Sequence, residues 1–139
     1  MNVQKIFIAS AAGAAMLFAS GYIIYVLLFG NSPIGLEESA KGVMLAASET
    51  RFSGIIVMEL LYGLLLAATL NWKGTNGFSS GLIPGALIGS LIGFTFGLDL
   101  LSTTSLVNFN YVIFAGVTYA VRYGLAGGVI ALVYGQNNQ

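Results

Sequence analysis

Three ionisable residues stand inside runs of apolar residues that are long enough to cross a membrane. They are Glu59 in VMELLYG, Asp99 in FGLDLLS and Arg122 in YAVRYGL. An ionised side chain at the centre of a membrane helix costs roughly 2.5 to 3.5 kcal/mol on insertion scales, so such residues usually face the bundle interior and find partners. A carboxylate in a cavity can bind a proton, a cation or a polar head group, whereas a carboxylate beside an arginine is neutralised. The pattern therefore indicates either an ion-handling site or a buried ion pair.

Helix geometry places the three residues in the same half of the bilayer. At about 1.5 Å per residue, Glu59 lies ~12 Å from the start of its span and Arg122 lies ~18 Å from the end of its span on the same side. Asp99 lies only ~5 to 8 Å from the end of its own span on that side. We predict an ion pair between Glu59 and Arg122, with Asp99 near the rim.

Tyrosines near these charges extend the predicted polar cluster. Tyr62 follows Glu59 by three residues, and Tyr119 precedes Arg122 by three. Residues at this spacing are neighbours on a helix surface. We predict an intramembrane polar cluster of Glu59, Arg122, Asp99, Tyr62 and Tyr119. Its structural interpretation is a neutral pair that fixes helix register, and its functional interpretation is a site for an ion, a proton or a polar ligand.

The composition disfavours most enzyme and metal chemistries. The chain has no His and no Cys, so zinc, iron–sulfur clusters, His-ligated haem and Ser/His or Cys/His nucleophile pairs lack their usual donors. Five basic residues balance five acidic ones, which leaves no basic patch for a nucleic acid. We expect no catalytic residues, no metal site, no cofactor and no nucleic-acid partner.

The elements that must position these residues are membrane spans. The chain has 139 residues, of which 57% are hydrophobic and 7% charged, whereas a soluble domain has about 25% charged residues. Crossing a bilayer takes about 20 apolar residues, and runs near or above that length cover residues 6–29, 52–70, 82–101 and 107–133. We predict one all-α domain over residues 1–139, folded as a four-transmembrane-helix bundle.

The connection between the first two spans is long enough to hold structure of its own. Ser32 and Pro33 form a plausible helix start. Apolar residues then recur at helical spacing: Leu36, Ala40, Val43, Met44 and Ala47. We expect a short interfacial helix here, with an ordinary solvated loop as the alternative. An even number of spans places both termini on one side of the membrane, and the positive-inside rule slightly favours the cytoplasmic side for them.

Small residues predict how the last two spans pack. The third span carries a glycine at every fourth position, and the fourth span carries a second row at the same spacing. The rows are Gly81, Gly85, Gly89, Gly93 and Gly97, and Gly116, Ala120, Gly124 and Gly128. Because missing Cβ atoms let helix backbones approach closely, we predict a tight antiparallel hairpin. Glycine zippers also occur at subunit contacts of oligomeric pores, which is the alternative.

Four segments resemble a family of small bacterial four-helix membrane proteins of unknown function. They are SGYIIYVLLFG, YGLLLAATLNWKG, GALIGSLIGFTFGLDLL and AGGVIALVYG. The resemblance implies the same fold in a bacterial inner membrane, and it supplies no catalytic residues to carry over.

Three functions fit these observations. The first, which we expect, is a non-enzymatic membrane component surrounded by lipids, either a homo-oligomer or an accessory subunit of a larger membrane complex. The second is a small oligomeric ion or proton channel or transporter that uses Glu59, Asp99 and Arg122. The third is a lipid, quinone or pigment binder with aromatic residues around an apolar crevice: Tyr22, Tyr25, Phe94, Phe96 and Tyr123.

Overall fold

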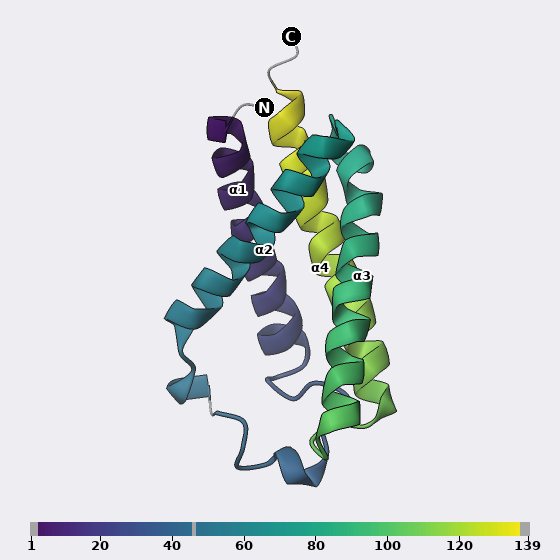
Figure 1. Cartoon of the computed structure of the whole chain (residues 1–139). Helices are drawn as coiled ribbons and strands as arrows, with labels where there is room; N and C mark the ends of the chain where they lie inside the picture. The colour runs from purple at the N-terminus through teal and green to yellow at the C-terminus, as the bar shows by residue number, and fades with distance from the viewer. Residues whose placement is uncertain (1–2, 46, 137–139) are drawn as a thin grey trace.

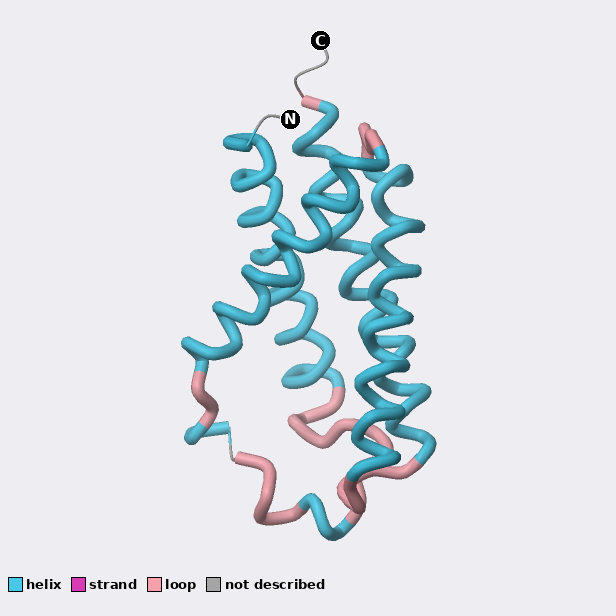
Figure 2. The backbone as a smooth tube through the Cα atoms, in the orientation of Figure 1, coloured by secondary structure: helices cyan, strands magenta, loops and turns pink. Residues whose placement is uncertain are grey.

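In a computed structural model, which describes residues 3–45 and 47–136, the chain is a bundle of long helices (Figure 1). The helices are α1 (Val3–Gly21), α2 (Phe52–Lys73), α3 (Phe78–Thr103) and α4 (Phe109–Gly135). Figure 2 shows helices joined by loops, with no strand in the described ranges. Each helix, with α1 extended to Leu28, is long and apolar enough to cross a membrane. The all-α four-helix prediction is therefore confirmed, while residues 1, 2, 46 and 137–139 of the predicted domain lie outside the described residues.

The helices run past most of the predicted span ends. The second helix continues to Lys73, where Gly74 takes a left-handed conformation and caps it. The third helix begins at Phe78 and contains Pro84, which stands inside the helix and not at its start. Hydrophobic runs mark the part of a helix in hydrocarbon, whereas the helix itself continues until its backbone groups are capped.

The first helix changes its hydrogen-bond pattern before it ends. From Tyr22 to Leu28 the chain forms a π-helical segment, η1, directly after Gly21. At its end the Phe29 amide donates to the Ile24 carbonyl at 3.1 Å, a bond across five residues instead of four. The hydrophobic pattern gives no sign of this change, so the first span is predicted as one uniform helix.

The predicted interfacial helix is not present in residues 30–45 and 47–51, the described part of this connection. In its place are two three-residue 3₁₀ turns, η2 (Glu38–Ala40) and η3 (Ala47–Glu49). Gly35 and Gly42 adopt φ values of +88° and +83°, which a right-handed helix cannot contain. The periodic apolar positions are therefore interrupted by two left-handed residues, and the helical prediction for this segment is wrong.

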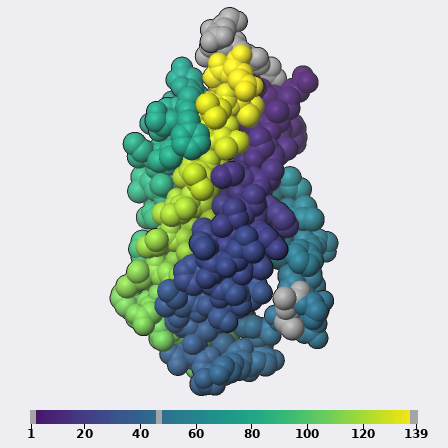
Figure 3. All heavy atoms as spheres, turned by 180° about the vertical axis from the view of Figure 1, so that it is seen from behind, coloured from purple at the N-terminus to yellow at the C-terminus, as the bar shows by residue number. Residues whose placement is uncertain are grey.

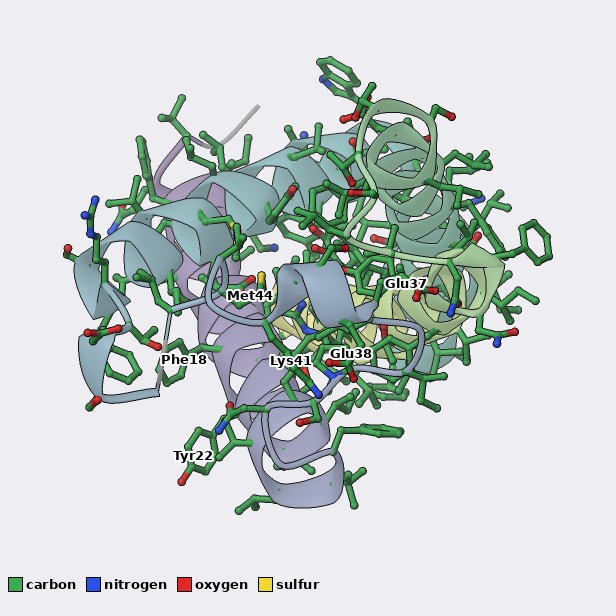
Figure 4. All side chains as sticks on the ribbon, turned by 90° about the horizontal axis from the view of Figure 1, so that it is seen from below. Phe18, Tyr22, Glu37, Glu38, Lys41 and Met44 are labelled. Carbon is green, nitrogen blue, oxygen red and sulfur yellow. The ribbon has the colours of Figure 1, made fainter. Side chains whose placement is uncertain are left out.

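The segment that replaces the helix is tied to the α3–α4 turn. Leu36 forms an isolated antiparallel bridge with Val107, and the Glu37 amide donates to the Leu106 carbonyl at 2.9 Å. The Asn108 side chain then donates to the Glu37 carboxylate at 2.8 Å. Figure 4, seen from this end of the bundle, shows Glu37, Glu38 and Lys41 on the segment that crosses it, while Tyr22 points away from the bundle. This connection therefore links the first helix to the second hairpin.

The fourth helix lies at the centre of the packing. Figure 3 shows α4 between α3 and α1, and α4 contacts each of the other three helices. In its most apolar window 56% of the residues are buried, against 28% in α2 and in α3. The second helix packs on α1 and barely contacts α3, and Figure 1 shows it leaning away from α3 toward its first residues. The start of α1 and the end of α4 lie at one end of the bundle, as an even number of crossings requires.

Candidate functional site

The glycine row of α3 lies against the backbone of α4. A Cβ atom added at Gly85 would overlap with the Tyr123 carbonyl, and one added at Gly89 would overlap with the Tyr119 carbonyl. The remaining three glycines meet α4 in the same way: Gly81 at Gly127, Gly93 at Ala115 and Gly97 at Val112. Helices can approach this closely only where the facing side chain is absent.

The row of α4 that receives these glycines is shifted by one position from the predicted row. The backbone contacts come from Ala115, Tyr119, Tyr123 and Gly127. The predicted residues accept side chains of α3 instead: Gly116 the ring of Phe94, Gly124 the methyl group of Ala86, and Gly128 the ring of Phe78. Because α3 supplies glycines along the whole contact, the opposing positions of α4 do not have to be small.

This close contact brings two tyrosines of α4 to the interior. The rings of Tyr119 and Tyr123 stack with centroids 5.6 Å apart, and the ring of Tyr62 on α2 meets Tyr123 edge-on at 5.4 Å. Tyr123 is fully buried, whereas Tyr62 and Tyr119 are half-buried. The three rings form a wall of the polar cluster.

The structure joins Glu59 and Arg122 in a buried ion pair. Arg122 is the central residue of α4, which has 27 residues and is therefore about 40 Å long. Its Nη2 donates to Glu59 Oε1 and also, at 3.1 Å, to the Leu17 carbonyl of α1. The two side chains are each 4% exposed. One guanidinium thus connects three helices near the middle of the bundle.

Aromatic rings and a glycine complete the surroundings of Arg122. Its Cζ lies 5.5 Å from the ring centroid of Tyr119 and 5.6 Å from that of Tyr25, within the range of cation–π attraction. A Cβ atom at Gly21 would lie 3.0 Å from Nη2, so the guanidinium also packs against the α1 backbone where η1 begins. These contacts compensate for part of the solvation that Arg122 loses.

Some hydrogen-bonding capacity of the cluster is unused within the described residues. Glu59 Oε2, Arg122 Nε and the Tyr123 hydroxyl are buried and have no hydrogen-bond partner there. Each belongs to a residue whose other atoms are held by the contacts above. No group of three metal-binding side chains occurs in residues 3–45 and 47–136. The buried ion pair and the groups that contact its guanidinium are together called the clamp: Glu59, Arg122, Leu17, Tyr25 and Tyr119.

The structure does not bring Asp99 into the cluster. Asp99 is exposed on α3, two residues after Gly97, whose backbone faces α4. A difference of two residues turns a side chain by about 200°, so Asp99 is directed away from α4. The depth of Asp99 in the membrane predicts that it lies near Glu59. Its side chain points away from α4, however, because the glycine row of α3 occupies the face toward α4.

Two members of the clamp were not found by sequence reasoning. The Leu17 carbonyl carries no side-chain signal, because any backbone oxygen is a candidate acceptor. The role of Tyr25 depends on the π-helical segment that carries it, and the apolar pattern does not reveal that segment. Its hydroxyl lies 3.3 Å from the Thr118 hydroxyl of α4.

Two lateral grooves flank α4, and both are almost wholly apolar. The larger, about 560 Å³, lies between η1 and α4, and among its described lining residues Asn110 and Thr118 are the polar ones. The smaller, about 300 Å³, lies between α3 and α4. Neither groove is lined by Glu59, Asp99 or Arg122. The charged residues and the grooves are therefore separate features.

Comparison of the chain with protein-family models, with curated proteins and with solved structures finds no match. A functional assignment therefore depends on the geometry described above.

Proposed function

We propose that this protein is a non-enzymatic integral membrane component that works as a homo-oligomer or as an accessory subunit of a larger membrane complex. The observation that carries the proposal is the buried pair of Glu59 and Arg122. The two charges neutralise each other in the middle of the bundle and hold α1, α2 and α4 together. Paired charges of this kind act on structure, and the most firmly established role of buried polar groups is to fix register.

The arrangement gives little support to ion transport within one protomer. An ion pathway needs polar groups arranged through the depth of the bilayer, or a charged residue that faces a water-filled cavity. The grooves beside α4 have apolar walls, and Arg122 is enclosed by Tyr25, Tyr119 and Gly21. Transport through a pore between protomers is the alternative that the experiment below includes.

The uncovered helix faces support an assembly. The outer side of α3, opposite the glycine row, carries Ile83, Leu87 and Leu91, which are 71%, 61% and 61% exposed. The third helix therefore has one face closely packed on α4 and one face available to lipid or to another subunit. These uncovered faces are apolar, so they are surfaces through which α3 can contact another subunit.

Mass measurement in lipid nanodiscs tests the proposal. We expect one discrete assembly, either a multiple of the 14.5 kDa chain or a complex with a second chain in fixed ratio. A 14.5 kDa monomer at every protein-to-lipid ratio contradicts the proposal. The same purified protein is also reconstituted into liposomes and tested for proton and cation flux. A flux that Glu59→Gln abolishes would favour the channel alternative.

The larger groove favours a second candidate function, the binding of an apolar chain such as a lipid or a quinone. Its length along α4, from Asn110 to Val121, is about 16 Å, and its walls match a hydrocarbon chain. Native mass spectrometry after delipidation tests this candidate. We expect one retained lipid-like adduct, and we expect Val117→Phe, which fills the groove, to remove it, while Leu87→Phe on the outer face of α3 retains it.

A further inference from the structure

The seven-residue segment η1 is π-helical. Such segments are rare, occur mostly as single-turn bulges and are frequent at functional sites. The sequence of η1, YIIYVLL, contains neither Gly nor Pro, so nothing in the sequence prevents an ordinary α-helix. Tertiary contacts must therefore hold η1 in the π form.

These contacts come from α4. Tyr25 and Phe29 both meet the ring of Phe114, with centroids 6.0 Å and 4.8 Å away. The Tyr25 hydroxyl lies 3.3 Å from the Thr118 hydroxyl, and the Tyr25 ring covers Arg122. Tyr25 thus connects the π segment to the ion pair.

Arg122 also touches the point where the α-helix becomes a π-helix. Gly21 is the last residue of α1, and a Cβ atom there would lie 3.0 to 3.2 Å from Nη2, Cζ and Nε of the guanidinium. The guanidinium therefore contacts η1 at Tyr25 and also contacts Gly21, the residue directly before η1.

The exposure pattern distinguishes the two helical forms. The buried row of α1 ends with Leu17, Ser20 and Gly21, and an α-helix would continue it through residues 24, 25 and 28. In the π form Leu28 is instead 68% exposed, and Val26 is half-buried. In the π form position 28 is thus more exposed than position 26, and in an α-helix we expect the opposite order.

We propose that η1 is a two-state element that is π-helical while Arg122 is held between Glu59 and Tyr25 and becomes α-helical when that hold is lost. Conversion would rotate Ile24, Leu28 and Phe29, which line the larger groove, and so reshape that groove. The ion pair and the groove, separate in space, would then be coupled through η1. This inference goes beyond the proposed function and does not depend on the oligomeric state.

Spin labelling tests the proposal, and the absence of native cysteine makes each label unique. Cysteines are introduced singly at Val26 and Leu28 and labelled in the folded chain in nanodiscs, and the accessibility of each label to oxygen is measured. We expect position 28 to be more accessible than position 26 in the unaltered background. We expect Arg122→Gln to reverse that order, while Arg51→Gln, at an exposed arginine outside the cluster, leaves it unchanged.

Gly21→Ala keeps the test decisive if Arg122→Gln does not fold. The added methyl group displaces the guanidinium from η1 and favours the α form, so we expect the same reversal. A label at Val117 in the groove should change its mobility in both variants. The proposal is overturned if position 26 is already the more accessible one in the unaltered background, or if neither variant that folds changes the order.

Discussion

Tyr119 lies between the glycine row of α3 and the guanidinium of Arg122. Its carbonyl packs against Gly89, its Cβ packs against Gly93, and its ring centroid lies 5.5 Å from Arg122 Cζ. The close approach of α3 and α4 therefore fixes the residue that covers one side of the buried charge. Because Tyr119 takes part in both contacts, a substitution that separates α3 from α4 should also change the surroundings of Arg122.

Breaking the ion pair should destabilise the bundle strongly. Glu59→Gln and Arg122→Gln each leave one buried charge without its partner, so we expect each to lower the free energy of unfolding by about 3–5 kcal/mol. The double variant leaves no isolated charge and should lose clearly less than the two single losses combined. Unfolding in detergent measures this coupling, and additive losses would show that the two residues do not interact.

The glycine row gives a prediction with a matched control. Alanine at Gly89 would place a methyl group on the Tyr119 carbonyl and push the two helices apart, so we expect a loss of about 1–3 kcal/mol. Gly54, in the first turn of α2, has no atom within 4 Å of an added Cβ. Alanine at Gly54 should therefore be neutral or should stabilise by up to about 1 kcal/mol. Equal effects of the two substitutions would contradict the close contact at Gly89.

The sequence predicts those features that depend on composition and depth. Long apolar runs identify the four helices, and counting residues from the span ends places Glu59 and Arg122 at similar depths. It does not predict features that depend on direction or on backbone conformation. Asp99 has a suitable depth, but its helix turns it outward, and the left-handed glycines at 35 and 42 interrupt a regular apolar spacing. The π-helical segment η1 contacts α4 through Tyr25 and Phe29, and its apolar sequence gives no sign of the π form.

Asp99 tests whether the direction of a side chain, and not its depth alone, decides whether the charge takes part in the cluster. Because its side chain is exposed and takes no part in the cluster, we expect Asp99→Asn to change the unfolding free energy by less than about 0.5 kcal/mol. Glu59→Gln serves as the comparison, since it removes the same kind of charge from a buried position. A loss at Asp99 as large as that at Glu59 would mean that the acid has a partner within the folded protein.

Removing either of two buried tyrosine hydroxyls should have different effects on stability. The Tyr134 hydroxyl donates to the Ala67 carbonyl at 2.7 Å and so joins α4 to α2. Tyr134→Phe should lower stability by about 1 kcal/mol, because it removes this bond. The Tyr123 hydroxyl has no partner among the described residues, so Tyr123→Phe should leave stability unchanged or raise it. A loss at Tyr123 as large as at Tyr134 would indicate that the Tyr123 hydroxyl is hydrogen-bonded in the membrane.

The backbone hydrogen bonds that join the first connection to the α3–α4 turn require glycine at position 35. Alanine there would have to adopt φ near +88°, and its methyl group would also overlap with the Tyr111 amide nitrogen. Gly42 has a similar φ of +83° but no atom within 4 Å of an added Cβ, so Gly42→Ala measures the backbone strain alone, about 1–3 kcal/mol. We expect Gly35→Ala to cost more and to accelerate hydrogen exchange at the amides of Glu37 and Asn108, which donate to Leu106 and Gly35. Because Gly42→Ala leaves these two bonds in place, it should not accelerate that exchange, and equal acceleration in both variants would mean that strain alone opens these bonds.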